Sequence, residues 1–224
     1  MSLGLVTGSQ PFAGLPDSPS QSLLAPVDGM TFDGVTIKAV ATEVSLAEVP
    51  QNMARLIREY QPAFIVSLGL APGETVLRFE STAINRLDFG VSDNHGVRPT
   101  DGRPIDPDGP PARMATWDAY RLAGMLRAAG LPARVSHHAG THLCNATLYA
   151  ALGAMEAQDM PGPCGFFHLP YLPEQVARFM SEAPAGGDLA PMTPRALPSM
   201  AFDDQLSALR LVLKSLSQSA RRSK

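Results

Sequence analysis

Cysteine is scarce in this chain, which has 224 residues and two cysteines, Cys144 and Cys164. Two cysteines are too few for the disulfide framework of a small secreted scaffold. A thiol that stays reduced can serve as a nucleophile, because the thiolate is the reactive form of cysteine. We therefore expect a reducing compartment, the cytoplasm.

Long apolar runs and charge of a single sign are lacking as well. No stretch approaches the roughly 18 consecutive apolar residues of a membrane span, and the first residues lack the cationic and apolar regions of a secretory leader. The net charge is −3. Clustered cations occur at the end of the chain, at Arg221, Arg222 and Lys224, as is typical of a solvated tail. We therefore expect neither a membrane nor a nucleic-acid partner.

What the chain does contain is enough apolar material for a large core, since 45% of its residues are hydrophobic. Short apolar runs alternate with stretches of helical period, a pattern typical of an α/β domain whose mostly parallel sheet is covered on both faces. We expect one catalytic domain over residues 1–224. The expected strands cover residues 3–7, 35–42, 64–68, 76–84, 133–136 and 165–169, and the expected helices cover 46–60, 117–129, 145–155 and 203–216.

Two segments read as irregular. Residues 93–111 contain five prolines together with glycines and aspartates, which predicts a long loop of the kind that forms lids or binding segments. Residues 184–198 resemble a second irregular connector. The last helix should begin with Asp203 or Asp204 as its N-cap, because a carboxylate can accept the unpaired N–H groups there.

Cys144 lies between an expected strand and an expected helix. A strand-to-helix turn would put its sulfur at the first helical turn, where free N–H groups and the helix dipole stabilise an anion. The same N–H groups could hold the oxyanion of a tetrahedral intermediate. From position alone, however, a buried and unreactive cysteine is the commoner interpretation.

Two further side chains are candidates for acid–base chemistry. His168 stands at the carboxyl end of a short apolar strand, the end at which ligands gather in open α/β sheets. Glu80 follows a strand-like stretch. A lone histidine on an apolar strand is more often a core residue, and a lone glutamate is more often a surface residue.

A metal site is the competing interpretation of the histidines near Cys144, which are His137, His138 and His142. Their spacing does not match a His-Glu-x-x-His helix, and no cysteine pair has ligand spacing. Gly-rich phosphate loops are also missing from the sequence. We therefore expect no metal and no organic cofactor.

Several motifs, in order along the chain, resemble the pyroglutamyl peptidase I (pyrrolidone-carboxylate peptidase) family of cysteine peptidases. The most specific blocks are Ala139-Gly140-Thr141 with Cys144-Asn145, and the run from His168 to Gln175. The others are Val6-Thr7-Gly8 before Pro11-Phe12-Ala13-Gly14, then Ala83-Ile84-Asn85, Asp93-Asn94 with Gly96, and Pro198-Ser199-Met200. Together they cover the chain almost from end to end.

This resemblance implies a single-domain three-layer α/β/α sandwich and removal of N-terminal pyroglutamate from peptides through a thioester. It assigns the nucleophile to Cys144, the base to His168 and the orienting acid to Glu80, and it leaves Cys164 without a catalytic role. It also implies small peptide substrates and a homodimer or homotetramer. The substrate pocket that it implies includes Phe12, Ser9, Gln10, Ser18, Leu70, Val91, His142 and Leu143.

The pocket departs from the family pattern while the triad is kept. Ser9 stands where the family has a pocket phenylalanine, His142 where an aromatic residue is common, and Gly90 where an arginine is expected. We expect a remodelled pyroglutamyl pocket, with Phe79, Phe89 or Phe166 as candidate replacement walls.

Three other functions remain as alternatives. A hydrolase of a related cyclic amide or another N-blocked peptide would keep the triad and change only the pocket. A non-catalytic binding homologue would keep the fold without needing all three groups. A nucleoside-phosphorylase-like enzyme would need phosphate and nucleobase sites, for which the sequence gives no motif.

Overall fold

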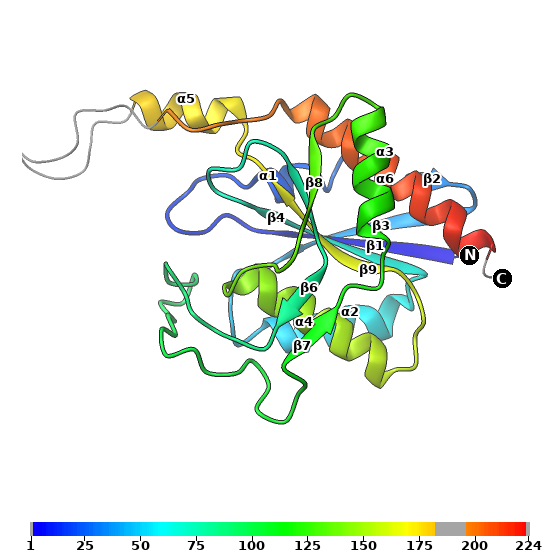
Figure 1. Ribbon diagram of the computed structural model, residues 1–224, viewed down its shortest axis with the longest axis horizontal. Coiled ribbons are helices and arrows are strands. Elements are labelled where there is room, and N and C mark those ends of the chain that lie inside the picture. Colours follow the sequence, from blue (N-terminus) through cyan, green and yellow to red (C-terminus); the bar gives the residue numbers. More distant parts are fainter. Residues whose placement is uncertain (1, 182–195, 223–224) are drawn as a thin grey trace, which may run out of the picture.

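Seven strands form the central sheet of the protein (Figure 1). The computed structural model describes residues 2–181 and 196–222. The spatial order of the strands is β2 (Thr31–Phe32), β3 (Val35–Thr42), β1 (Ser2–Ser9), β4 (Phe64–Leu70), β9 (Cys164–Leu169), β5 (Leu77–Glu80) and β8 (Ala133–Ser136). Strands β3, β1, β4 and β9 are parallel to one another, whereas β5 runs antiparallel to β9 and parallel to β8. The predicted mostly parallel sheet is confirmed.

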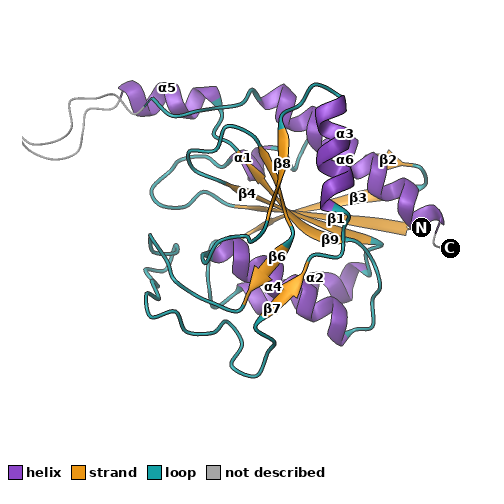
Figure 2. Cartoon of the chain, viewed as in Figure 1, coloured by secondary structure: helices purple, strands orange, loops and turns teal. Residues whose placement is uncertain are grey.

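Helices cover both faces of this sheet, which gives three layers (Figure 2). One face is covered by α2 (Val49–Tyr60) and α4 (Leu143–Ala157), which pack against each other. The other face carries α1 (Pro19–Ser22), α3 (Ala119–Ala128) and α6 (Phe202–Arg222). Helix α5 (Pro173–Ser181) follows β9 and packs Val176 against Leu70 and Tyr171.

Alternation along the central strands divides the core between these two faces, because successive side chains of a strand point to opposite sides. Ile65 and Phe166 belong to the cluster under α2 and α4. Phe64 and Phe167 belong to the cluster under α3 and α6. Strands buried on both faces read as continuous apolar runs, which explains why 64–68 and 165–169 could be recognised in the sequence.

The expected elements agree with the structure except at some boundaries. The strands at 35–42 and 133–136 have the predicted bounds. The stretch 76–84 is two strands, because β6 (Thr82–Ile84) leaves the central sheet and pairs with β7 (Ala112–Met114). The last helix begins at Phe202, so the prediction of Asp203 or Asp204 as its N-cap is wrong; both carboxylates lie in its first turn, where the helix dipole also favours them.

The predicted long loop is present, since residues 85–111 form neither helix nor strand. Buried side chains hold it in place: the Asn85 amide donates to the carbonyl of Asp106, and the Asp93 carboxylate accepts N–H groups of Leu46, His95 and Val97. Most of the predicted connector 184–198, namely residues 184–195, lies outside the described residues.

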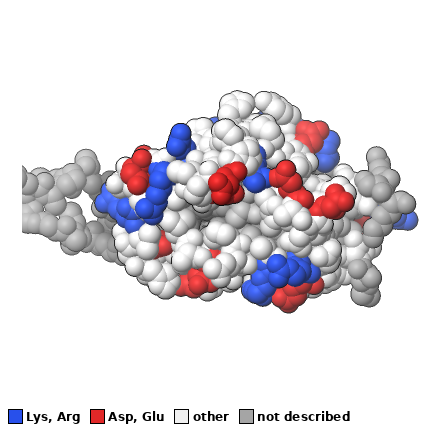
Figure 3. All heavy atoms as spheres, turned by 90° about the horizontal axis from the view of Figure 1, so that it is seen from below, with Lys and Arg blue, Asp and Glu red and all other residues white. Residues whose placement is uncertain are grey.

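The outer surface of the α2 and α4 layer carries small, separate groups of basic and acidic side chains (Figure 3). This mixture agrees with the net charge of −3. Among the described helices, none combines the length and apolar character that crossing a bilayer requires.

Gly165 in β9 should be essential for packing, and its replacement provides a stability test. A Cβ at Gly165 would lie 2.0 Å from Cε2 of Trp117, so Gly165→Ala must displace the indole. We expect Gly165→Ala to lower the free energy of unfolding by about 1–3 kcal/mol or more in urea denaturation. The matched control is Gly124→Ala in α3, where the nearest atom is 3.9 Å away. Because alanine favours a helix, the control should gain about 0.5–1 kcal/mol. Equal effects at both sites would contradict the packing argument.

Candidate active site

The register between β5 and β9 brings the two acid–base candidates together. His168 pairs with Arg78 across the antiparallel ladder, and Glu80 pairs with Phe166. Paired residues and their neighbours two positions away share one face of a sheet, so Glu80 and His168 become diagonal neighbours beneath α4. Glu80 and His168 are 88 residues apart in the sequence, and the pairing of β5 with β9 brings them together.

Glu80 and His168 form a buried hydrogen-bonded pair. Nδ1 of His168 lies 2.7 Å from Oε1 of Glu80, and both side chains are almost inaccessible to solvent. Arg78 donates to the same oxygen through Nε at 3.0 Å and Nη2 at 2.7 Å. Burial alone would raise the pKa of Glu80, but the hydrogen bond and charge of His168, then Ser136 and Arg78, hold that pKa below its ordinary value. Glu80 is therefore an anion that fixes the imidazole.

Cys144 is the second residue of α4, as the sequence predicted for a thiol in a first helical turn. The neighbouring Asn145 is fully buried and anchors this end of the helix: its Oδ1 accepts from Ile84 N–H at 2.8 Å, and its Nδ2 donates to the carbonyl of Ile84 at 2.8 Å. Since Ile84 ends β6, which directly follows Glu80 and β5, this clamp ties the thiol to the strand that carries the carboxylate.

The Cys144 thiol completes a line of three groups with His168 and Glu80. Burial lowers the pKa of His168, but the charge of Cys144 and hydrogen bonds with Cys144 and Glu80 outweigh burial and raise it to about 9. Because Nδ1 is bonded to Glu80, Nε2 is the ring nitrogen available to the sulfur. The arrangement can therefore take a proton from a thiol and keep it on a stabilised imidazolium.

Gly69 makes room for the sulfur, a role that the sequence did not reveal. It lies opposite His168 in the parallel pairing of β4 with β9. A Cβ at Gly69 would lie 2.7 Å from the Phe166 ring and 3.0 Å from Cys144 Sγ. Any larger residue would therefore push the thiol or the ring out of place.

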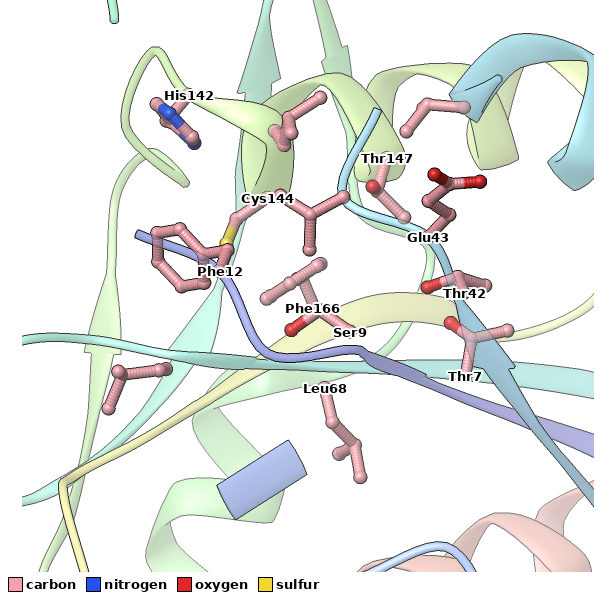
Figure 4. A pocket seen from close by; sticks show the side chains of 14 residues that line it. Thr7, Ser9, Phe12, Thr42, Glu43, Leu68, His142, Cys144, Thr147 and Phe166 are labelled. Atoms are coloured by element: carbon pink, nitrogen blue, oxygen red, sulfur yellow. The ribbon is translucent and has the colours of Figure 1, made fainter. Parts of the chain in front are cut away.

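A pocket of about 450 Å³, including its open mouth, lies beside the thiol (Figure 4). It is lined by the ends of β1, β3 and β4 and by the first turns of α4. Of the eight pocket residues expected from the sequence, five line it, namely Ser9, Phe12, Leu70, His142 and Leu143. The expectation missed Thr7, Thr42, Glu43, Val44, Val49, Leu68 and Thr147. Five of these residues lie at or just after the carboxyl ends of adjacent parallel strands, where such sites form, whereas Val49 and Thr147 belong to α2 and α4.

Three expected pocket residues lie behind the wall or beside it. The Ser18 hydroxyl donates to the carbonyl of Ser9 at 2.7 Å, and the Gln10 N–H extends the pairing with Thr42. Val91 contributes its carbonyl to the His142 ring instead of a side chain to the pocket wall.

The His142 ring forms an aromatic wall of the pocket. Its ring lies 4.0 Å from the ring of Phe89 and 6.0 Å from that of Phe12, measured between centroids. Nε2 is 3.0 Å from the Val91 carbonyl, to which it donates. Burial lowers the pKa of His142, so the ring is neutral at neutral pH.

The candidate replacement walls have different locations. Phe166 lines the pocket, and Phe89 supports His142 from behind. Phe79 packs with Trp117 and Phe167 on the opposite face of the sheet, so the expectation that it could be a wall is wrong. Strand alternation is the reason, since Phe79 points away from the face that carries Glu80.

The histidines near Cys144 do not gather with other ligands. Within residues 2–181 and 196–222, no three His, Cys, Asp or Glu side chains are grouped as a metal ion would require. His138 instead accepts the Gly140 N–H at its Nδ1.

Comparison with known proteins gives concordant matches. A family model described as Pyroglutamyl peptidase matches residues 3–219. The pyrrolidone-carboxylate peptidase of Thermococcus litoralis is 30% identical over 210 residues, covering 94% of this chain and 90% of that protein. That of Cupriavidus pinatubonensis is 37% identical over 180 residues, covering 80% and 83%.

Solved structures agree with this match. The pyrrolidone carboxyl peptidase from Thermococcus litoralis aligns with a TM-score of 0.87 at 28% identity, covering 100% of this chain and 97% of that one. A mutant pyrrolidone carboxyl peptidase from Pyrococcus furiosus aligns with a TM-score of 0.88 at 26% identity, covering 96% and 98%.

The two thiols should differ sharply in reactivity. Cys144 is partly accessible, whereas Cys164 is completely buried, and burial raises the pKa of its thiol to about 12. In the native protein we expect iodoacetamide at neutral pH to modify Cys144 more than roughly 100-fold faster than Cys164. Peptide mass spectrometry over time measures both rates, and unfolding in urea should make them similar. Equal rates of modification of Cys144 and Cys164 in the native protein would contradict the burial of Cys164.

The raised pKa of His168 predicts a pH-dependent stability. Its pKa is about 9 in the folded protein against 6.5 without the fold. Protonation of His168 therefore adds to the free energy of unfolding. This contribution is fully present below about pH 6.5 and is lost as the pH rises through about 9. We expect the stability difference between wild type and His168→Gln to shrink over this range. Urea unfolding at several pH values measures it, and a difference that stays constant or grows would refute the assignment.

Proposed function

Because this chain belongs to the pyroglutamyl peptidase family, we propose that it removes an N-terminal pyroglutamyl residue from peptides, with Cys144 as the nucleophile. The observation that carries the proposal is the chain of contacts from Glu80 through His168 to Cys144, with 2.7 Å between Glu80 Oε1 and His168 Nδ1. The enzyme is a cysteine-type peptidase.

The first half of the reaction forms the thioester. His168 takes the thiol proton at Nε2, and the Cys144 sulfur attacks the carbonyl carbon that joins pyroglutamate to the next residue. Glu80 stabilises the imidazolium, as its lowered pKa allows. His168 then gives the proton to the nitrogen of the departing peptide, the amide bond breaks, and the acyl group stays on sulfur.

Backbone N–H groups at the start of α4 are suited to the oxyanion. Ala146 is the first residue of this helix whose N–H reaches the His142 carbonyl, so the N–H groups of Leu143, Cys144 and Asn145 have no partner within the helix. The helix dipole at this end also favours negative charge. We assign the oxyanion to this turn.

The second half of the reaction releases the product. A water molecule enters after the peptide leaves, and His168 Nε2 removes its proton as the oxygen attacks the thioester carbon. The carbon–sulfur bond breaks, the thiolate returns, and pyroglutamate leaves as the free acid. The group that moves each proton is His168, so the cycle closes with water as the only other reactant.

The pocket favours a neutral ring over a charged N-terminus. Phe12, Leu143 and Phe166 provide apolar surface near the thiol, and the neutral His142 adds an aromatic wall. Moving an unpaired ammonium group against such surface costs several kcal/mol, whereas a lactam needs only partners for one N–H and one C=O. This difference supports an exopeptidase for blocked N-termini.

Location and assembly remain part of the proposal. We place the protein in the cytoplasm, which agrees with two free thiols, one of which must stay reduced for the reaction. The homodimer or homotetramer follows from the resemblance, and the long loop offers a surface for it through its exposed Val91 and Val97.

A fluorogenic pyroglutamyl amide tests the proposed chemistry. We expect turnover by the wild type that is insensitive to chelators, and a loss of roughly 10⁴-fold in kcat/KM for Cys144→Ala and for His168→Gln. Cys164→Ala is the matched control, because that thiol is completely buried and does not line the pocket. Turnover that survives in Cys144→Ala would rule out thiol catalysis.

A further inference from the structure

The pocket beside Cys144 has a far compartment that a pyroglutamyl ring does not need. Four polar residues form it, namely Thr7, Thr42, Glu43 and Thr147, and all four line the same pocket as Cys144. In Figure 4 they lie together on one side of the pocket, while Phe12, His142 and Cys144 lie on the other. The pocket therefore has an aromatic half at the thiol and a polar half beyond it.

Three of the four residues of the far compartment, Thr7, Thr42 and Glu43, offer hydrogen-bond acceptors rather than donors. The Thr7 hydroxyl donates its hydrogen to Ser67 Oγ at 2.8 Å, and the Thr42 hydroxyl contacts the Gly8 carbonyl at 3.4 Å as donor. Each hydroxyl has a single hydrogen, so what these two can still offer to a ligand is a lone pair. A carboxylate such as that of Glu43 also offers only lone pairs.

Glu43 is held at the edge of this compartment. Its Oε1 lies 2.6 Å from Nε2 of His95, which comes from the long loop, and both side chains are about half exposed. This contact uses one carboxylate oxygen and leaves Oε2 for a ligand. The negative charge adds to the acceptor character of the compartment.

Ser9 explains why the compartment is open. The carboxyl end of β1 carries the small Ser9 side chain, whose hydroxyl is tied to Ser20 Oγ at 2.9 Å on the side of α1. A short side chain that is bonded away from the pocket leaves the path between the thiol and Thr7 free.

A plain pyroglutamyl ring complements only the aromatic half. Its one donor is the lactam N–H, and its remaining atoms are CH₂ groups and a carbonyl acceptor. Acceptors and CH₂ groups facing an acceptor-lined compartment would leave its lone pairs unpaired, and unpaired polar groups weaken binding. A donor at the far end of the ring would satisfy them.

We propose that this pocket accepts N-terminal lactam residues whose ring carries an extra hydrogen-bond donor away from the scissile carbonyl, with an amino group preferred, and that Glu43 determines this preference. The inference rests on the proposed function, because it assumes the same attack by Cys144. Nothing in the chemistry changes: the substituent does not react, and it only binds in the far compartment.

Three coumarin amides test this proposal. One carries plain pyroglutamate, and the other two carry an aminomethyl or an ethyl group on the ring carbon next to the lactam carbonyl. The last two have nearly equal size, so the ratio of their kcat/KM values isolates the donor. For the wild type we expect the aminomethyl substrate to be favoured by about five-fold or more, since the partly exposed carboxylate is screened by water.

Variants identify the residue responsible. Glu43→Gln removes the charge at constant shape and should reduce the ratio to near one. Thr42→Val removes an acceptor lone pair and should lower the ratio by a smaller factor. Glu48→Gln is the matched control, because Glu48 is an exposed carboxylate of the same connection that does not line the pocket, and it should leave the ratio unchanged. Thermal unfolding checks that each variant is folded.

The outcomes separate this inference from the proposed function. Turnover of the plain amide with a ratio near one, or with a ratio that Glu43→Gln does not change, overturns the inference alone. Turnover of the aminomethyl amide without turnover of the plain amide supports the inference and restricts the substrate class. No turnover of any amide overturns both proposals.

Discussion

The buried contact between Glu80 and His168 is the interaction on which the candidate site depends. Placing a carboxylate and an imidazolium in the interior is costly unless each has a partner. Here the carboxylate receives His168 and both Arg78 donors on one oxygen, and the imidazole has the Cys144 thiol on its other side. The antiparallel insertion of β5 next to β9 makes this contact geometrically available.

The thiol is held in position by the packing around it as much as by its own helix. Asn145 fixes the beginning of α4 to Ile84, the last residue of β6, and Gly69 leaves the space into which the sulfur fits. The Asn145 hydrogen bonds and the space at Gly69 lie on the same face of the sheet. Together they determine the position of Cys144 relative to His168. Such support agrees with the precision that a nucleophile and its base require.

The walls of the pocket can vary more freely than the three groups that react. The reaction needs only the thiol, the imidazole and the carboxylate, so the walls can change while the chemistry is conserved. Ser9 opens the pocket toward Thr7, and His142 keeps an aromatic contact with Phe89 while adding a polar edge. We regard substrate preference, rather than reaction type, as the property that Ser9 and His142 affect.

The sequence by itself determined the α/β class, the strands at 35–42 and 133–136, the position of Cys144 in a first helical turn, and the assignment of three groups to one site through motif resemblance. These features are local, because they depend on periodicity, turn residues and contiguous motifs. Only the tertiary structure decided which strands are neighbours, and with that the contacts of Arg78 and Gly69 and the place of Glu43 in the pocket wall. Those roles arise from contacts between segments far apart in the chain, and side-chain patterns within one segment carry no information about them.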